Sequence, residues 1–137
     1  KRASSYAKYL GVRMVICHKS RLRANEVAEM RIIGDVKGAD VLLIDDMVDT
    51  AGTITKAANL MLENGAKSVR AIASHAVMSD PASSRVGESA LTEMIFTDSI
   101  PYANHCEKVR VLSVADMFAE AIRRVCKNES ISTLYAI

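Results

Sequence analysis

Three carboxylates and two hydroxyl side chains follow an apolar run in the stretch VLLIDDMVDTAGT, residues 41–53. Two of the acids, Asp45 and Asp46, are adjacent, and the third is Asp49. The turn after them consists of small residues, with a glycine that tolerates any φ and two threonine hydroxyls, which suits a cradle for phosphate oxygens. A carboxylate repels a phosphate unless sugar hydroxyls or a divalent cation lies between them. The stretch therefore predicts a binding site for a phosphorylated sugar.

The two adjacent acids are expected to have different roles. Neighbouring residues on a strand point to opposite faces, so only one of Asp45 and Asp46 needs to contact the sugar. A simpler alternative is that the acids only cap the helix that follows them. The length of the pattern favours the binding site, because the acids, the hydroxyls and the glycine occur together in one specific order.

The elements around this stretch are expected to place it at the edge of a parallel sheet. Val41–Ile44 is predicted to be a buried strand, and helical spacing of apolar residues predicts a helix over 53–63 that Asn64 and Gly65 end. The β-rich segment 69–77 completes a strand, helix, strand unit. Ligands of such sheets bind beyond the carboxyl ends of the strands, where the next helix presents its first N–H groups.

The remaining segments also alternate between helices and strands. The sequence predicts a helix over 3–10 ended by Gly11, a strand over 12–17, a basic and solvated loop over 18–31, and a short strand or hairpin arm before Gly34. Beyond residue 79 it predicts a helix that Pro81 begins, strands over 91–98 and 109–114, and a helix from Ser113, with Ser113 and Asp116 as its capping pair. The fold class is therefore α/β, one domain over 1–137 with an open, mostly parallel sheet flanked by helices.

Composition argues against several classes of protein. Eighteen basic and sixteen acidic residues give a net charge of +2, too small to predict binding to nucleic acid or to a membrane surface. No apolar run approaches the ~18 residues of a membrane span. Cys17, Cys106 and Cys126 lack paired spacing, so we expect reduced thiols in a cytoplasmic protein. Because the first residue is Lys1, we expect a piece of a longer chain.

The acid-rich stretch resembles the phosphoribosyl diphosphate-binding motif of type I phosphoribosyltransferases, and its D-D-x-x-D-T-A-G-T form is similar to that of ribose-phosphate pyrophosphokinases. Other segments resemble the same synthetases in order and spacing: HKSRLRANEV, IIGDVKG, AANLMLENGAKSV, SHAVMSDPASSRV, AEAIRRV and NESISTLY. Together they cover nearly the whole chain. Ordinary phosphoribosyltransferases share the acid-rich loop but not these flanks, so the synthetase family is preferred.

The resemblance implies a type I phosphoribosyltransferase-like fold that lacks its first strand, and a reaction. The family transfers the β,γ-diphosphate of ATP to the 1-hydroxyl of ribose 5-phosphate with Mg²⁺ and releases AMP. By resemblance, the 5-phosphate is held by Asp49, Thr50, Ala51, Gly52 and Thr53, and the ribose hydroxyls by Asp45 with Asp46 nearby. Lys19 and Arg21 are implied to be mobile cations that stabilise the transferring diphosphate, although Ser20 replaces a basic residue frequent in the family. Without the resemblance, this basic loop is an ordinary solvated run.

The resemblance further implies that the chain is the carboxyl-terminal half of a two-domain enzyme and is inactive alone. ATP is then bound mainly by the other domain and a neighbouring subunit. The full-length enzyme is implied to be a homo-oligomer, a dimer or an assembly of the hexamer-of-dimers type. No residue here is assigned as a metal ligand. Ser130, Ser132 and Tyr135 are implied to contribute to a regulatory phosphate or nucleotide site. Two alternatives stay open: a type I phosphoribosyltransferase, and a non-catalytic regulatory subunit.

Four further residues receive no catalytic role. His75, near the predicted carboxyl edge of the sheet, is expected to be structural or to support the site from behind. His18 and His105 lie in polar surroundings, and Arg85 is expected on a helix surface or in an interface.

Overall fold

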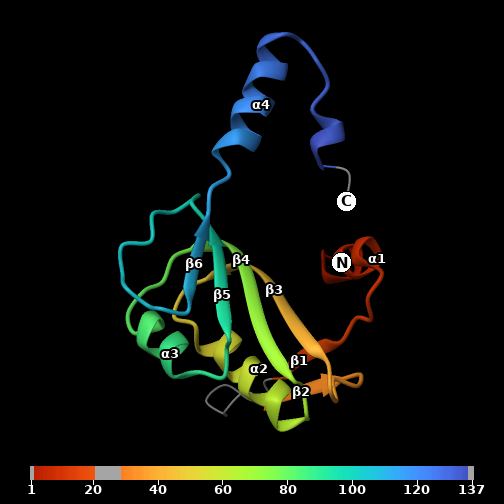
Figure 1. The fold of residues 1–137 in the computed structure, drawn as a ribbon, viewed down its shortest axis with the longest axis vertical. Helices are drawn as coiled ribbons and strands as arrows, with labels where there is room; N and C mark the ends of the chain where they lie inside the picture. Colours follow the sequence, from red (N-terminus) through yellow and green to blue (C-terminus); the bar gives the residue numbers. More distant parts are fainter. Residues whose placement is uncertain (1, 21–28, 136–137) are drawn as a thin grey trace.

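The computed structural model describes residues 2–20 and 29–135, and Figure 1 shows their fold. Helices and strands alternate along the chain as the sequence predicts. The helices are α1 (Arg2–Leu10), α2 (Gly52–Glu63), α3 (Ala82–Glu88), α4 (Ala115–Cys126) and the 3₁₀ helix η1 (Ser132–Tyr135). The strands are β1 (Ile16–Ser20), β2 (Glu29–Ile33), β3 (Asp40–Val48), β4 (Ser68–Ala76), β5 (Glu93–Thr97) and β6 (Val109–Leu112).

Four of the strands form one parallel sheet in the order β3-β4-β5-β6. Each of the first three is hydrogen-bonded to the strand that follows it in the chain, and Asp45 on β3 pairs with Ala73 on β4. The prediction of an open, mostly parallel α/β sheet is therefore confirmed. Because the strands are parallel, the residues that end β3, β4 and β5 meet along one edge of the sheet.

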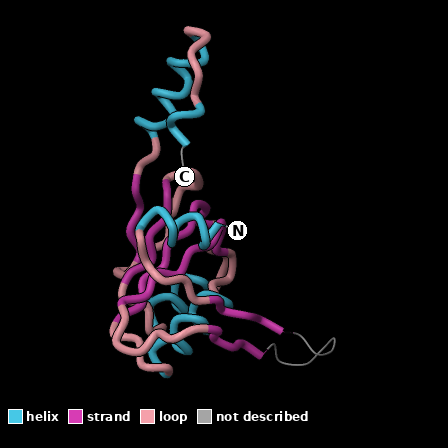
Figure 2. The backbone as a smooth tube through the Cα atoms, turned by 90° about the vertical axis from the view of Figure 1, so that its right-hand side faces the viewer, coloured by secondary structure: helices cyan, strands magenta, loops and turns pink. Residues whose placement is uncertain are grey.

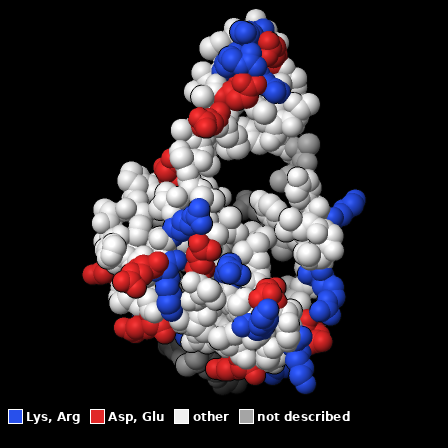
Figure 3. Space-filling view, in the orientation of Figure 1, with Lys and Arg blue, Asp and Glu red and all other residues white. Residues whose placement is uncertain are grey.

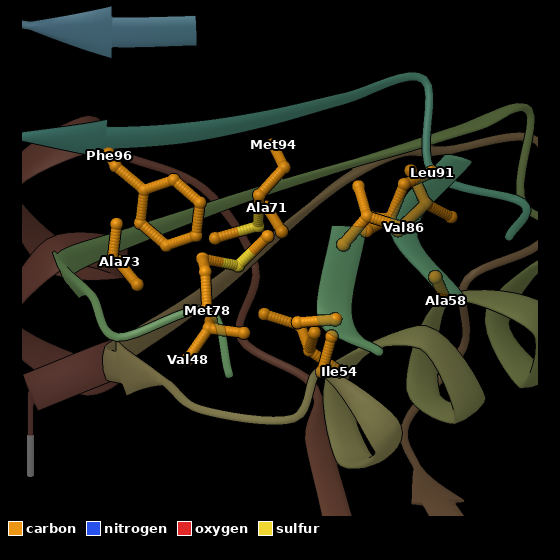
Figure 4. Close-up of a cluster of buried hydrophobic side chains, with 14 of the residues drawn as sticks. Val48, Ile54, Ala58, Ala71, Ala73, Met78, Val86, Leu91, Met94 and Phe96 are labelled. Atoms are coloured by element: carbon orange, nitrogen blue, oxygen red, sulfur yellow. The ribbon is translucent and has the colours of Figure 1, made fainter. Parts of the chain in front are cut away.

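The core lies between one face of this sheet and the helices α2 and α3. Small residues of β4, such as Ala71 and Ala73, let the helices approach closely, and large side chains of β5 fill the space between them. Figure 4 shows Phe96 and Met94 directed toward Met78, Val48 and the two helices. Phe96, Met94 and Ala71 are completely buried. This packing fixes the start of α2 against the end of β3, where the acid-rich stretch lies.

The opposite face of the sheet is more exposed than the core face. Leu42 is 45% exposed, and the side chains of Ile44, Ile72 and Ile95 are partly exposed. Helix α4 projects away from the sheet (Figure 1), and none of its residues is buried. On the face of the molecule shown in Figure 3, basic and acidic side chains are interspersed.

The basic segment after residue 17 differs from its prediction. We expected a strand over 12–17 followed by a solvated, partly helical loop to residue 31, but β1 starts only at Ile16 and pairs antiparallel with β2. The pair projects as a two-stranded arm (Figure 2), and residues 21–28 lie outside the described residues. The prediction was wrong because the charged residues of this segment break the alternation of apolar and polar residues that indicates a strand. The strands are instead joined by cross-strand pairs such as Ile16 with Ile33 and Cys17 with Ile32.

Two further boundaries need correction. Strand β3 runs to Val48, so Asp45 and Asp46 lie within the strand and not beyond it. Helix α4 begins at Ala115 with Val114 as its cap residue, so Ser113 is not the N-cap that the sequence predicted. The Ser113 hydroxyl instead accepts from the Ala115 amide at 3.2 Å, a local turn that competes with capping. Within the described ranges, every helix is too short or too polar to traverse a lipid bilayer.

Candidate functional site

A hollow of about 190 Å³ lies where β3 ends and α2 begins. It is lined by residues of a single continuous segment: Asp45, Met47, Val48, Asp49, Thr50, Ala51, Gly52, Thr53 and Ile54. All five residues predicted to hold a phosphate are among them. The buried anchors Val48 and Ile54, at 4% and 6% exposed, fix the two ends of the turn in the core, and the polar residues between them face the hollow.

The turn adopts a backbone conformation that suits an anion. Ala51 has φ 59° and ψ 0°, the left-handed region, and Gly52 is the first residue of α2. Adjacent residues of opposite hand turn successive backbone N–H groups toward one concave side, where an anion binds. The left-handed conformation costs an L residue roughly 1–2 kcal/mol, so the surroundings of Ala51 must hold it there.

A buried hydroxyl fixes this turn from the helix side. The Thr55 hydroxyl donates to the Ala51 carbonyl oxygen at 2.8 Å, and the Thr55 amide donates to the same oxygen at 3.1 Å. This amide is the first to join the hydrogen-bond ladder of α2. The amides of Gly52, Thr53 and Ile54 therefore precede the ladder at the positive end of the helix dipole.

A second clamp comes from α3. Arg85 donates from Nη1 to the carbonyl oxygen of Thr50 at 2.9 Å, across 35 residues of sequence. The sequence prediction placed Arg85 on a helix surface, and the side chain is indeed exposed. Its contact with the turn was missed, because no pattern in the sequence relates a turn residue to a helix residue 35 positions away.

The adjacent acids lie between two hollows. Asp45 lines the hollow described above and also a second one of about 380 Å³, which Asp46, Tyr6 and His75 line as well. The Asp45 carboxylate accepts from the Asp46 amide at 2.9 Å. The structure thus brings Asp45, Asp46 and the predicted phosphate turn, residues 49–53, together at one edge of the sheet.

A row of hydroxyl groups supports the neighbouring end of β4. The ring nitrogen Nδ1 of His75 lies 2.9 Å from the Ser99 hydroxyl, and both Ser99 and Thr97 donate to the Ser74 carbonyl, at 2.9 and 2.6 Å. Beside them, a hydrogen bond from the Ser113 hydroxyl, with one from the Val114 amide, lowers the pKa of Asp98. His75 therefore has a structural partner and also faces the second hollow, in agreement with its predicted supporting position.

Other predicted site residues lie elsewhere or outside the described part of the chain. Arg21 is not among the described residues, and of Lys19 only the backbone, in β1, is described. Beyond α4, the hydroxyl oxygens of Ser130 and Ser132 lie 2.9 Å apart. Tyr135 ends η1 and is 50% exposed. Among the described residues, no group of three His, Cys, Asp or Glu side chains is placed to hold a metal ion.

The tail beyond α4 is fixed to that helix by charged groups. Arg124 donates to the Thr133 hydroxyl at 2.7 Å and to the Ser130 carbonyl at 3.2 Å. Hydrogen bonds from Arg123 and Arg124 lower the pKa of Glu120 to about 2. These contacts define the local shape of the predicted regulatory segment.

Comparison with known proteins identifies relatives over nearly the whole chain. The family model described as phosphoribosyl synthetase-associated domain matches residues 16–136. A ribose-phosphate pyrophosphokinase of Porphyromonas gingivalis is 78% identical over 98% of this chain, and one of Helicobacter hepaticus is 52% identical over 98%. The crystal structure of phosphoribosylpyrophosphate synthetase from Mycobacterium smegmatis matches with a TM-score of 0.83 and 41% identity over 91% of this chain.

The chain spans less than half the length of these relatives. It covers 43% of the P. gingivalis and H. hepaticus proteins and 41% of the M. smegmatis chain. Because the family model covers most of this sequence, the match shows a family and not only a fold: the chain belongs to the phosphoribosyl synthetase-associated domain family.

Proposed function

We propose that this chain carries the ribose 5-phosphate site of a ribose-phosphate diphosphokinase. That enzyme transfers the diphosphate of ATP to the 1-hydroxyl of ribose 5-phosphate and yields phosphoribosyl diphosphate and AMP. The observation that carries the proposal is the left-handed Ala51 at the start of α2, with the carboxylates of Asp45 on β3 and Asp49 just after β3 along the same hollow. The names of the relatives agree with this reaction, and their greater length indicates that this chain is one part of the enzyme.

The proposed roles follow from the distribution of charge around the hollow. The amides of Ala51 and Gly52, with the hydroxyls of Thr50 and Thr53, bind the 5-phosphate at the positive end of α2. Asp45 accepts hydrogen bonds from the ribose hydroxyls, which separate its negative charge from the phosphate. These are binding and orienting roles, and they place the 1-hydroxyl of the sugar for attack on the β-phosphorus of ATP.

Further groups complete the proposed site. Lys19 and Arg21 supply positive charge to the transferring diphosphate, which stabilises the charge that grows there during the reaction. Mg²⁺, when bound, neutralises phosphate oxygens and polarises the transferring group. Mg²⁺ is commonly held by one or two carboxylates plus substrate phosphates, so Asp45 and Asp46 on the second hollow fit it despite the lack of a three-residue cluster among the described residues.

We also propose that the active form is a homo-oligomer in the cytoplasm. Helix α4 and the open face of the sheet leave Phe118, Ile122 and Leu42 exposed, and exposed apolar groups of this size favour association. The three cysteines are free, as in proteins of reducing compartments.

Calorimetric titration of this chain tests the proposal. We expect ribose 5-phosphate to bind more tightly than either ribose or inorganic phosphate, because only the phosphosugar uses both the acids and the amides. Free nucleobases should not bind, which separates this function from that of a phosphoribosyltransferase. A coupled assay of AMP release should show no turnover by this chain alone. Equal affinity for phosphate and ribose 5-phosphate would refute the sugar site.

A further inference from the structure

We infer that Arg85 is a positioning residue for the phosphate turn: it holds the peptide between Thr50 and Ala51 in the one orientation in which the Ala51 amide faces the anion. The identity of the anion, the 5-phosphate of ribose 5-phosphate, rests on the proposed function, but the orientation of the peptide does not.

Arg85 contacts the backbone of the turn and not the hollow in which the ligand is proposed to bind. Arg85 is not among the described residues that line the hollow, and its Nη1 atom contacts the Thr50 carbonyl oxygen at 2.9 Å. A Cβ added to Gly52 would lie 3.6 Å from the same Nη1 atom, so the guanidinium lies against the turn itself. The side chain therefore acts on the backbone.

Helix α3 gives Arg85 a fixed base. The Ser83 hydroxyl lies 3.0 Å from the hydroxyl of Tyr102, and the Ala90 amide just beyond the helix donates to the Asn59 side chain of α2 at 2.9 Å. Val86, the next residue, is completely buried in the core. Since both helices are tied to the same core, the distance between α3 and the turn is set by packing.

The geometry of the peptide bond converts this contact into a direction for the amide. In a planar trans peptide the carbonyl and the following N–H point in opposite directions. A Thr50 carbonyl held toward Arg85 therefore directs the Ala51 N–H away from Arg85, and we infer that this is the concave side of the turn because Ala51 lines the hollow and Arg85 does not. If the same peptide turned over, its carbonyl oxygen would face the hollow and repel a phosphate.

The turned-over peptide is a realistic competitor because it relieves the backbone of Ala51. A rotation of that peptide by about 180° moves φ of Ala51 from +59° to about −120°, out of the left-handed region that is costly for an L residue, while ψ stays near 0°. The guanidinium opposes this rotation, because a hydrogen bond from a charged donor is stronger than one from a neutral donor. Arg85 thus holds Ala51 in the less favoured conformation that the anion needs.

The test compares Arg85→Met with Arg110→Met in this chain. Arg110 is an exposed arginine on β6, paired with Glu93 at 3.9 Å, so its removal controls for the loss of one positive charge. Two quantities are measured: the sign of φ at Ala51 in the ligand-free protein by solution NMR, and the affinity for ribose 5-phosphate by calorimetry. We expect Arg85→Met to lose the positive φ and to bind roughly tenfold or more weakly, and Arg110→Met to change neither.

A second substitution gives a signature that a merely structural role would not produce. Glycine accepts positive and negative φ almost equally, so Ala51→Gly removes the advantage of the turned-over peptide. In the Arg85→Met background Ala51→Gly should recover part of the affinity that Arg85→Met loses.

A positive φ at Ala51 that persists in Arg85→Met overturns the positioning role of Arg85, whether or not affinity falls. An equal loss of affinity on Ala51→Gly in the unmodified protein and in Arg85→Met overturns it too. If the unmodified chain fails to bind ribose 5-phosphate, the proposed function fails, but the φ measurement still decides the role of Arg85. Should Arg85→Met fail to fold, the comparison is made with Arg85→Lys, which keeps the charge and loses the planar donor geometry.

Discussion

Substitution of Gly52 by alanine separates what the fold needs from what the ligand needs. Gly52 is the first residue of α2 and lines the hollow. Its φ is not in the left-handed region, and an added Cβ would meet only Arg85 Nη1 within 4 Å, at an ordinary contact distance of 3.6 Å. Nothing in the fold therefore requires glycine at this position.

The two effects of Gly52→Ala have opposite signs. Alanine in place of glycine stabilises a helix by about 0.5–1 kcal/mol, with the lower value applying near a helix start. For 137 residues the entropy of unfolding is about 290 cal/mol/K, so Tm should rise by about 2–3 °C. Because Gly52 lines the hollow, an added methyl group there should keep a phosphate from its closest approach, and the loss of one charged hydrogen bond lowers affinity about 10- to 100-fold.

The assay is thermal unfolding together with calorimetric titration of ribose 5-phosphate. Gly87→Ala is the matched control, because Gly87 also lies in a helix, has no left-handed φ and has room for a Cβ 3.9 Å from Cys106 Sγ. It should raise Tm by a similar amount and leave binding unchanged. The reasoning is refuted if Gly52→Ala lowers Tm, or if it raises Tm and binds the phosphosugar as before.

Three other predictions concern the acid, the hydroxyl clamp and the tail. Asp45→Asn should weaken binding of ribose 5-phosphate more than binding of inorganic phosphate, because its carboxylate is assigned to the sugar; equal effects in calorimetry would contradict the assignment. Thr55→Val keeps the buried shape but removes the hydroxyl bond to Ala51, so urea unfolding should show a loss of about 1 kcal/mol, and an unchanged stability would show that this bond contributes nothing. The folded pKa of Glu120 is lowered to about 2, so its pairing with Arg123 and Arg124 should be complete above about pH 4.5 and be lost as pH falls through 2. NMR of the arginine side-chain N–H groups should follow this loss, and Glu120→Gln should abolish the pH dependence.

The sequence was sufficient for those parts of the fold that rest on local pattern. The helix after the acids and the strand after it came from apolar spacing and from Asn64 and Gly65, and the structure differs from the predicted ends by a single residue at each of three boundaries. The extent of β3 was underestimated because consecutive acids do not look like strand residues. In the structure Asp45 completes the register with Ala73, so pairing with β4 overrides local propensity.

Contacts between distant segments were beyond the reach of sequence patterns. The pairing of β1 with β2 was missed because its partners are separated by the basic residues around Arg21. The link between Arg85 and Thr50 depends on how α3 packs beside α2, and only tertiary packing sets that distance. The amino-acid types that bind a phosphate were therefore predictable, whereas the group that orients their backbone was not.

Three successive residues of the turn together hold a backbone conformation that is not the most stable one for this sequence. The carbonyl of Thr50 is held by a charged side chain, Ala51 has a left-handed backbone, and Gly52 gives up the helix stability that alanine would provide. The left-handed Ala51 and the glycine at position 52 cost free energy in the absence of a ligand, and the hydrogen bond from Arg85 offsets part of that cost; such costs concentrate at binding sites. If the turn had only a structural role, replacing each residue by its most stable alternative would raise Tm and leave anion binding unchanged. Gly52→Ala should instead raise Tm and weaken anion binding together, whereas stabilising substitutions in α3 away from Arg85 should raise Tm alone.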